Sequence, residues 1–178
     1  MRPRFGIRVA RIRYRLTQGF SYLRPRNPTR IDERLRQLLR PEELRLIECL
    51  SVADRAHHLN VRDCLVRHGC GDEELLTAAL LHDVGKADAD ARVGLVGRTL
   101  SVLLEGASPG LTRRFASTSG GGLRRALDLS ARHPQRGAEM ARAAGCSDRV
   151  CWIIAHHHDK DAMDDSVKLL QRADDGEL

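Results

Sequence analysis

Apolar residues recur along most of the chain at the spacing of one helical face. In the segment around His57, for example, Ala53, His57 and Val61 follow one another every fourth residue. Rows of this kind are typical of amphipathic helices, whereas a half-buried strand alternates apolar and polar residues. No segment shows a convincing alternation of period two, and no internal repeat is evident. The pattern therefore predicts an all-α protein.

Capping residues and helix breakers divide this pattern into successive helices. The expected helix starts are Thr29, Pro41, Ser51 or Asp54, and Asp72. The first of these helices is expected to end near Leu39, the third near Gly69 and the fourth at His82. Further helices are expected over residues 92–105, 122–131, 134–144, 147–158 and 163–174. Residues 106–122 are rich in Gly, Ser and Thr, which favours a flexible loop that could act as a lid.

The composition fits a single domain with an aliphatic core. A chain of 178 residues is long enough for one sizeable core, and with 3% aromatic residues that core must consist of Leu, Val, Ile and Ala. Such a mixture suits helices better than a β-sandwich. No stretch approaches the about 20 apolar residues of a membrane helix, and no secretory signal is visible. The five cysteines, an odd number without a C-x-x-C pair, indicate a cytoplasmic protein.

Positive charge is concentrated near the N-terminus. Residues 1–30 contain nine arginines and no acid, whereas the whole chain has a net charge of +6, so residues 31–178 are net acidic. We therefore divide the chain into a basic N-terminal arm, residues 1–30, and a domain, residues 31–178. Residues 5–23 could form a basic helix that contacts an anionic membrane or nucleic acid. The alternatives are a helix that packs on the domain with solvated charges, and a partly disordered leader.

His82 and Asp83 are adjacent residues of the types that bind metals, and they end an apolar helical run. An imidazole beside a carboxylate can bind a divalent cation, and the carboxylate can also bridge to a second one. Lys86 follows closely and would place a positive charge near a bound phosphate. Taken alone, such a pair is more often a helix-terminal histidine with a capping aspartate. Its significance comes from the further candidate ligands His57, His133, His156, His157 and Asp174, in the order H…HD…H…HH…D.

Helix periodicity selects between neighbouring histidines. His57 lies in the apolar row described above and is predicted to point inward, whereas His58 lies on the polar face and is predicted to face solvent. His157 continues the apolar row of its own helix and is favoured as the inward ligand. His156 could also face the site, and His158 could take its place after a small rotation.

The two remaining candidates lie at predicted helix ends. His133 precedes Pro134, a residue suited to the first turn of a helix, so its side chain is expected at a helix start. Asp174 ends the apolar side of the last predicted helix. Without the other members of the set, His133 would be interpreted as a capping or surface residue and Asp174 as part of a solvated acidic tail.

The ordered set resembles the HD superfamily of metal-dependent phosphohydrolases. The similar segments are residues 54–61 around the first histidine, residues 80–86 around the His-Asp pair, residues 133–137, residues 154–159 with their I-x-x-H-H pattern, and residues 169–174. The resemblance extends over residues 40–176 and implies a single HD-type helical bundle. The Gly-Tyr-Pro signature of the subgroup that cleaves cyclic di-GMP does not follow the histidine pair.

The resemblance also implies a reaction and its cofactors. Two divalent transition metals per chain are expected, from among Fe, Mn, Zn, Co and Ni. The first would bind His57, His82, Asp83 and Asp174, and the second Asp83, His133, His157 and His156. The implied enzyme is a phosphatase or phosphodiesterase that uses a metal-bridging hydroxide on a phosphorylated small molecule or nucleotide, with Asp83 and Lys86 as catalytic residues. The alternatives are a catalytically weak regulatory domain that binds metal and nucleotide, and an adaptor that acts through its basic arm.

Overall fold

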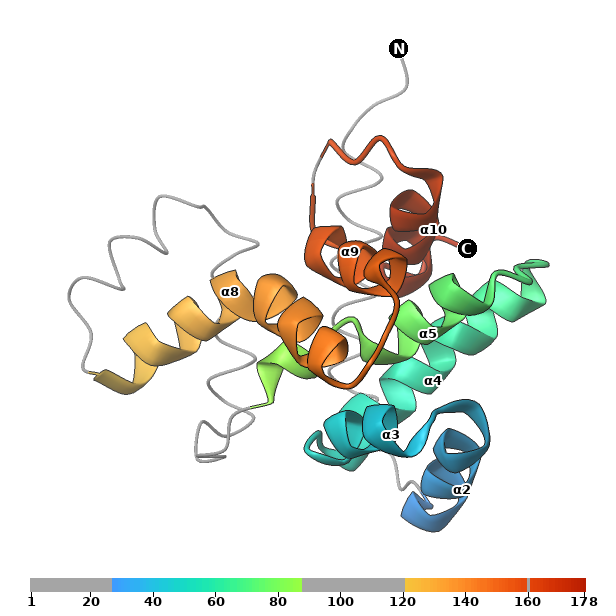
Figure 1. Cartoon of the computed structure of the whole chain (residues 1–178), viewed down its shortest axis with the longest axis horizontal. Helices are drawn as coiled ribbons and strands as arrows, with labels where there is room; N and C mark the ends of the chain where they lie inside the picture. The colour runs from blue at the N-terminus through green and yellow to red at the C-terminus, as the bar shows by residue number, and fades with distance from the viewer. Residues whose placement is uncertain (1–26, 88–120, 160) are drawn as a thin grey trace.

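The computed structural model describes residues 27–87, 121–159 and 161–178. All regular structure in these residues is helical, which confirms the all-α prediction. The α-helices are α2 (Pro28–Leu38), α3 (Pro41–Glu48), α4 (Val52–Arg67), α5 (Glu73–Leu81), α8 (Gly121–Ala143), α9 (Asp148–His156) and α10 (Asp165–Asp174). One turn of 3-10 helix, η1 (Val84–Lys86), follows α5. Figure 1 shows these elements along the chain.

Side-chain caps explain where most of these helices begin. The caps at Ser51, Asp72, Ser147 and Asp164 each accept a hydrogen bond from a backbone N–H of the first turn. Such a bond satisfies one of the donors that a helix start leaves without a partner. The predicted starts at Pro41, Ser51 and Asp72 are thereby confirmed.

The first described helix begins earlier than predicted. Its cap is Asn27, whose Oδ1 accepts from the Arg30 N–H at 3.2 Å, and Pro28 occupies the first turn. The prediction of Thr29 as the cap is therefore wrong by two residues. Asparagine is a better cap than threonine, and proline suits the position after a cap because no partner is needed for its nitrogen there.

One continuous helix, α8, replaces the two helices predicted over residues 122–131 and 134–144. Pro134 lies inside α8, so the preceding His133 lies within a helix and not at a helix start. Proline weakens a helix because it removes one donor and clashes with the carbonyl four residues earlier. Packing compensates here: the second half of α8, in which Ala138 and Ala141 are buried, contacts both η1 and α9.

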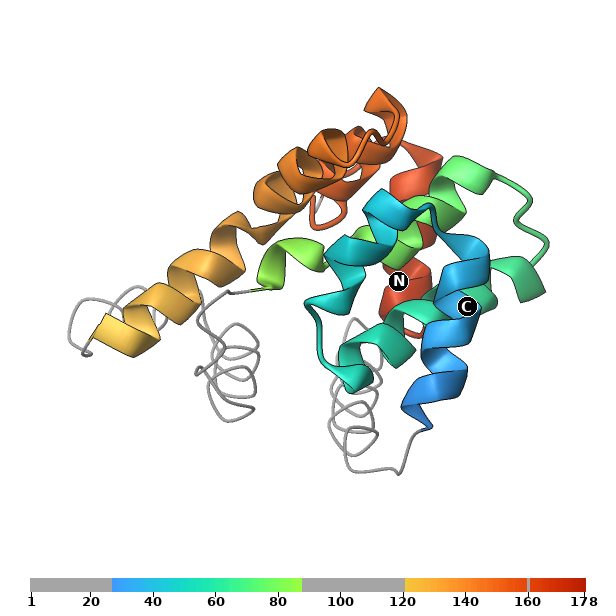
Figure 2. The same cartoon turned by 60° about the horizontal axis from the view of Figure 1, so that its bottom comes forward.

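The core is centred on α5. In this helix Leu75, Leu76, Leu80 and Leu81 are each almost completely buried, and only Glu73, Glu74 and Thr77 are not buried. Helices α3, α4, α9 and α10 all contact α5. Figures 1 and 2 show α4 and α9 on opposite sides of α5, while α8 extends away from the body. Helix α10 packs against α4, α5 and α9. The residues that follow α5 therefore emerge from the middle of the core.

A close backbone approach fixes η1 against α8. A Cβ atom added to Gly85 would lie 2.0 Å from the carbonyl oxygen of His133 and 2.7 Å from the backbone nitrogen of Gly137. The guanidinium of Arg136 donates a hydrogen bond to the Gly85 carbonyl at 3.2 Å. Only glycine leaves room for this contact, which sets the position of α8 relative to the segment after α5.

Arg149 joins the start of α5 to the last two helices. Its guanidinium, on α9, pairs with the Asp72 carboxylate at 2.5 Å and donates to Ser166 Oγ of α10 at 3.0 Å. Asp72 also caps α5 by accepting hydrogen bonds from the backbone N–H groups of Glu74 and Leu75. One carboxylate therefore caps α5 and connects it to α9. The hydrogen bonds from Arg149 lower the pKa of Asp72 to about 2.

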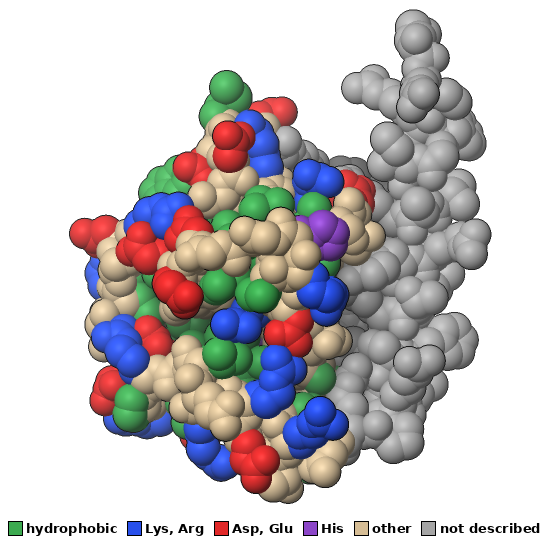
Figure 3. All heavy atoms as spheres, turned by 90° about the vertical axis from the view of Figure 1, so that its right-hand side faces the viewer, with side chains coloured by type: hydrophobic (Ala, Val, Ile, Leu, Met, Phe, Trp, Pro, Cys, Tyr) green, Lys and Arg blue, Asp and Glu red, His purple; other side chains and the backbone are tan. Residues whose placement is uncertain are grey.

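Charges are mixed on the face of the molecule that Figure 3 draws. On the face drawn in Figure 3, Lys and Arg side chains alternate with Asp and Glu and do not gather into a patch of one sign. None of the helices that the structure describes has the length and apolarity needed to cross a bilayer. The predicted helices over residues 5–23 and 92–105, and most of the basic arm and of the 106–122 loop, lie outside the described residues.

Gly85→Ala should destabilise the fold and displace α8. The added methyl group would meet backbone atoms that cannot rotate away, so we expect the free energy of unfolding to fall by about 1–3 kcal/mol or more. Gly71→Ala is the matched control, because a Cβ there meets nothing within 4 Å. Urea denaturation of both variants measures the difference, and equal stability of the two would show that the approach at Gly85 is not tight.

Asp72→Asn should lower stability at neutral pH, while an asparagine can still cap α5. Asp72 has a depressed pKa in the fold and one of about 3.9 when unfolded, so its charge stabilises the fold above pH 4 and the contribution is lost as the pH falls through about 2. Since both partners are partly exposed, we expect about 0.5–1 kcal/mol. Denaturation at pH 7 and pH 2 measures this contribution. If the variant is less stable than the wild type by the same free energy at pH 2 as at pH 7, the charge of Asp72 is not the cause. The control is Asp148→Asn, at an exposed aspartate.

Candidate metal centre

Five segments bring candidate ligands together at the end of the core. The residues that converge are His57 from α4, His82 and Asp83 after α5, His133 from α8, His157 and His158 after α9, and Asp174 from α10. Six of them are residues that the sequence indicated as ligands, and His158 is the addition. Sequence separations between them reach 117 residues, so the cluster exists only because the helices pack around α5.

The first group consists of His57, His82 and Asp174. His57 Nε2 lies 2.8 Å from Asp174 Oδ1, and His82 Nε2 lies 3.7 Å from the same oxygen. Atoms that bind one ion at about 2.1 Å each can lie at most about 4.2 Å apart. Both separations satisfy that limit, so these three side chains could hold one divalent ion.

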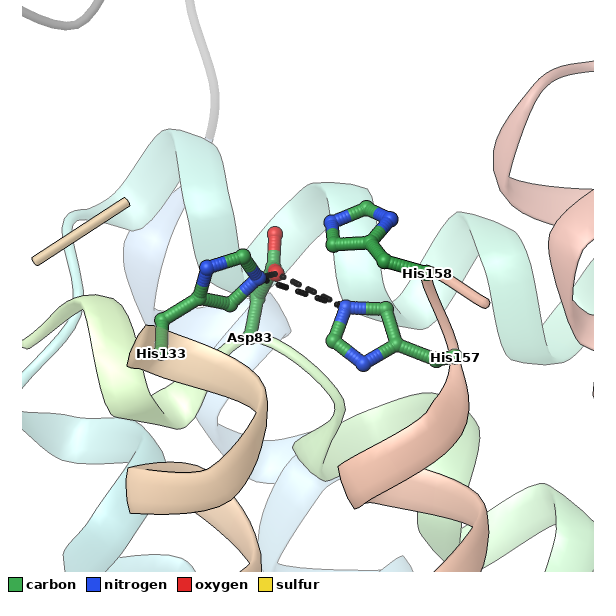
Figure 4. A group of neighbouring side chains, drawn as sticks. All are labelled: Asp83, His133, His157 and His158. Atoms are coloured by element: carbon green, nitrogen blue, oxygen red, sulfur yellow. Dashed lines mark hydrogen bonds and ion pairs between the residues drawn. The ribbon is translucent and has the colours of Figure 1, made fainter. Parts of the chain in front are cut away.

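The second group consists of Asp83, His133, His157 and His158. His133 Nε2 and His157 Nε2 lie 3.2 Å and 3.5 Å from Asp83 Oδ1, and 3.4 Å from each other. Figure 4 shows the two rings directed at this oxygen, with the His158 ring beside them. Three imidazoles and a carboxylate therefore surround a second possible ion position.

The two oxygens of Asp83 face different groups. Oδ1 is directed at His133 and His157, whereas Oδ2 lies 3.6 Å from His82 Nε2 and 2.7 Å from the ammonium of Lys86. A carboxylate in this position can bind one ion through each oxygen. Asp83 therefore lies between the two groups, and its role as a shared ligand stays a prediction.

Backbone carbonyls fix the orientation of the buried imidazoles. Nδ1 of His82 lies 2.9 Å from the Ala79 carbonyl oxygen, and Nδ1 of His157 lies 2.6 Å from that of Ile154. A carbonyl oxygen only accepts, so each Nδ1 carries the hydrogen and each Nε2 keeps its lone pair for another partner. Histidines that bind metals are commonly held in this way by a hydrogen bond from the second ring nitrogen.

Two buried polar atoms of the cluster have no hydrogen-bond partner among the described residues. They are His82 Nε2 and Asp83 Oδ1, one in each group. An unsatisfied buried polar atom destabilises a fold by about 1–3 kcal/mol. A cation in each group would satisfy one of these atoms, so the donor set fits a metal site in each group.

The protonation states also suit metal binding. Burial alone would raise the pKa of Asp83, but the charge of Lys86 and the nearby imidazoles hold it well below its usual range. Burial likewise opposes ionisation of Asp174, and the hydrogen bond from His57 outweighs it and lowers that pKa. Burial lowers the pKa of His82 far enough to keep its ring neutral. Ionised carboxylates and neutral imidazoles are the forms that bind metals.

His57 behaves differently from the buried rings. Burial lowers its pKa, but the hydrogen bond and the charge of Asp174 outweigh that effect, and the net pKa is raised. The Nε2 of His57 therefore holds a hydrogen for Asp174 more readily, and a cation would have to displace it. Metal binding at this position would accordingly release a proton.

His58 is buried and does not face solvent as predicted. Its side chain is 1% exposed, and its Nδ1 lies 2.7 Å from the Leu80 carbonyl oxygen. Helices α2, α5 and α10 all pack against α4, so the polar row that contains His58 is covered by α5. Burial lowers the pKa of His58 to about 4, which keeps the ring neutral at physiological pH.

The structure places His156 outside the cluster and His158 inside it. His156 donates to the Trp152 carbonyl oxygen at 2.8 Å and stacks on the Trp152 ring, with 4.4 Å between centroids. Helix α9 ends at His156, so the two following histidines no longer obey the helical period used to rank them. The I-x-x-H-H register beginning at Ile154 was the signal that selects His157 and His158.

One edge of the centre is open to solvent. His57, Asp174 and Lys86 are partly exposed, with 37% of the Lys86 side chain accessible, whereas His82, His133 and His157 are buried. The centre is therefore accessible from the side of Lys86, while the buried imidazoles form its floor.

Comparison with known proteins finds no relative of this chain. No family model matches the chain, and no curated protein or solved structure matches it. The interpretation of the centre therefore depends on its own geometry and chemistry, together with the ordered residue pattern in the sequence.

Proposed function

We propose that this chain is a metal-dependent phosphohydrolase of HD type, a phosphatase or phosphodiesterase that acts on a phosphorylated small molecule or nucleotide. The observation that carries the proposal is the position of Asp83, whose two oxygens face two separate groups of candidate ligands. Pairs of metal ions that share a carboxylate are suited to phosphoryl chemistry, because both the attacking and the leaving oxygen require stabilisation.

The residues available to hold two ions divide between the groups. His57, His82, Asp83 and Asp174 would hold one ion, and Asp83, His133, His157 and His158 the other. Mixed imidazole and carboxylate donors favour Fe, Mn, Co, Ni or Zn over Ca or Mg. Two such ions, when bound, would polarise a phosphoryl group and make a water molecule more acidic.

Lys86 would act on the phosphate of the substrate. Burial lowers the pKa of its ammonium, but the ion pair with Asp83 outweighs this effect and raises it, so the group stays cationic. It lies on the open edge of the centre, next to the shared carboxylate. A cation there would neutralise charge on phosphate oxygens as it develops during bond cleavage.

The buried imidazoles would hold the ions in a fixed geometry and exclude water from one side of the centre. His82, His133 and His157 are each at most 2% exposed, whereas His57, Asp174 and Lys86 form an accessible edge in the described part of the chain. The backbone hydrogen bonds of His82 and His157 prevent ring rotation, which keeps the Nε2 of each directed at the shared carboxylate. A substrate phosphate would therefore meet a preorganised floor and the cation of Lys86.

The purified protein, reconstituted with Mn²⁺ or Fe²⁺ and desalted, should contain about two ions per chain by mass spectrometry. We expect about one ion in Asp174→Ala and in His133→Ala, because each variant removes a ligand from only one group. His68→Ala, an exposed histidine away from the cluster, is the control and should keep both. About one ion in the wild type would rule out the second group as drawn.

Lys86→Ala should lower kcat by about 10²–10³-fold on phosphate esters while leaving the metal content unchanged. The measurement is release of phosphate or nitrophenol from a panel of mononucleotides, dinucleoside polyphosphates and bis(4-nitrophenyl) phosphate. Asp83→Asn should reduce turnover to background, and Lys168→Ala, a partly exposed lysine on α10, should have no effect. A wild type that holds two ions and binds nucleotide without turnover would support the regulatory alternative instead.

A further inference from the structure

A hollow with an aromatic wall lies where α9 ends and α10 begins. The end of α9, the residues that follow it and the first turn of α10 form its lining. Its volume of about 490 Å³ falls within the range of pockets that take small organic molecules. None of the residues in the two ligand groups lines it, so the hollow is separate from the metal centre.

Trp152 and Met163 give the hollow an exposed apolar wall. They are 41% and 87% exposed, and they are two of the three large apolar residues exposed in the described part of the chain. His156 stacks on the Trp152 ring with 4.4 Å between centroids and bonds to the Trp152 carbonyl oxygen. One face of the indole is therefore covered and the ring is held in place, while the rest of its surface is open to a ligand.

The polar part of the lining is acidic. Three aspartates border the hollow, whereas no lysine or arginine does so among the described residues. The three are Asp159, Asp161 and Asp164. Residues 159–165 contain four aspartates and one lysine, a net charge of −3. Lys168, near the start of α10, donates to the Met163 carbonyl oxygen and to Asp165. The hollow therefore repels anions such as phosphate and attracts cations.

An aromatic wall beside carboxylates matches the chemistry of an organic ammonium group. The face of an indole attracts a cation, and the carbon atoms bonded to an ammonium nitrogen pack on apolar side chains. The carboxylates add attraction between opposite charges. A nucleobase could stack on Trp152, but it would make no use of the negative charge of the lining.

The hollow lies within reach of the metal centre. His157 and His158 of the second ligand group lie in the chain between two residues that border the hollow. On α10, Val167 borders the hollow and Asp174 belongs to the first ligand group. These two residues are about two helical turns apart, which is roughly 10 Å along the axis. One small molecule can therefore extend from the hollow to the centre.

We propose that the hollow binds an ammonium group of the substrate, so that the compound hydrolysed at the centre is a phosphate ester of an amino alcohol. The phosphate would lie at Lys86, and the ammonium group would lie against Trp152 and the aspartates. Water would form the new bond to phosphorus, the ester P–O bond would break, and the alcohol would leave with a proton from the water. The hydrolysis rests on the proposed function, whereas binding of an organic cation rests on the hollow alone.

Fluorescence of Trp152 tests the binding directly, because Trp152 is the single tryptophan of the chain. The full-length protein is titrated with tetramethylammonium chloride, and with sodium chloride at the same ionic strength. We expect a saturable change in fluorescence with tetramethylammonium alone. Asp161→Asn should weaken the binding by about 2–5-fold, the effect of an exposed charge pair. Asp148→Asn, at an exposed aspartate that does not border the hollow, is the control and should bind as the wild type does.

A pair of esters that differ only in the ammonium group tests the substrate class. The full-length protein, reconstituted with Mn²⁺, is assayed with trimethylammoniohexyl phosphate and with hexyl phosphate. We expect kcat/KM to favour the cationic ester by about 5-fold or more, mainly through KM. Trp152→Leu should reduce this ratio by about 2–5-fold, and Trp152→Phe should reduce it less because it keeps an aromatic face. Val66→Ala, at an exposed apolar residue outside the hollow, is the control.

Other results would overturn the inference. Equal responses to tetramethylammonium and sodium would show that the hollow binds no organic cation. A saturable response to adenosine without one to tetramethylammonium would assign the hollow to a nucleobase instead. Equal kcat/KM for the two esters would refute the substrate class while the proposed hydrolysis stands. Saturable binding of tetramethylammonium by a protein that hydrolyses no phosphate ester would support the cation site, and the proposed function would fail.

Discussion

The buried carboxylate of Asp83 is the feature on which the arrangement of the centre depends. Removing an ion from water destabilises a fold by several kcal/mol unless partners compensate. Here the compensation comes from the ammonium of Lys86, 2.7 Å from Oδ2, whereas Oδ1 faces His133 and His157 without a hydrogen-bond partner among the described residues. The position of α5 in the middle of the core makes this burial unavoidable, because the chain leaves that helix directly into Asp83.

Stability and ligand binding are coupled through the same atoms. The fold keeps two buried polar atoms of the cluster, His82 Nε2 and Asp83 Oδ1, without hydrogen bonds among the described residues. A ligand that satisfies them binds the folded chain and not the unfolded one, and it stabilises the fold in proportion to its affinity. The caps and the aliphatic core are what hold the unsatisfied cluster in place until then.

The centre is also a consequence of one backbone contact. Gly85 allows η1 to lie against α8, and this contact brings His133 to the carboxylate that precedes Gly85 by two residues. Because α8 continues through Pro134, the histidine projects from within a rigid helix and not from a loose helix start. Residues held on rigid elements maintain ligand geometry better than residues on loops.

The sequence by itself determined the helical class, most helix starts and the residue types of the centre. Apolar periodicity and capping chemistry are local properties, so they can be read without tertiary contacts. The tertiary structure alone decided which neighbouring histidines enter the centre. His58 is buried because α5 covers a polar row of α4, and His158 replaces His156 because the chain leaves the helical period where α9 ends. Both outcomes depend on packing between helices and on where a helix ends. The apolar periodicity of a single helix carries no information on either.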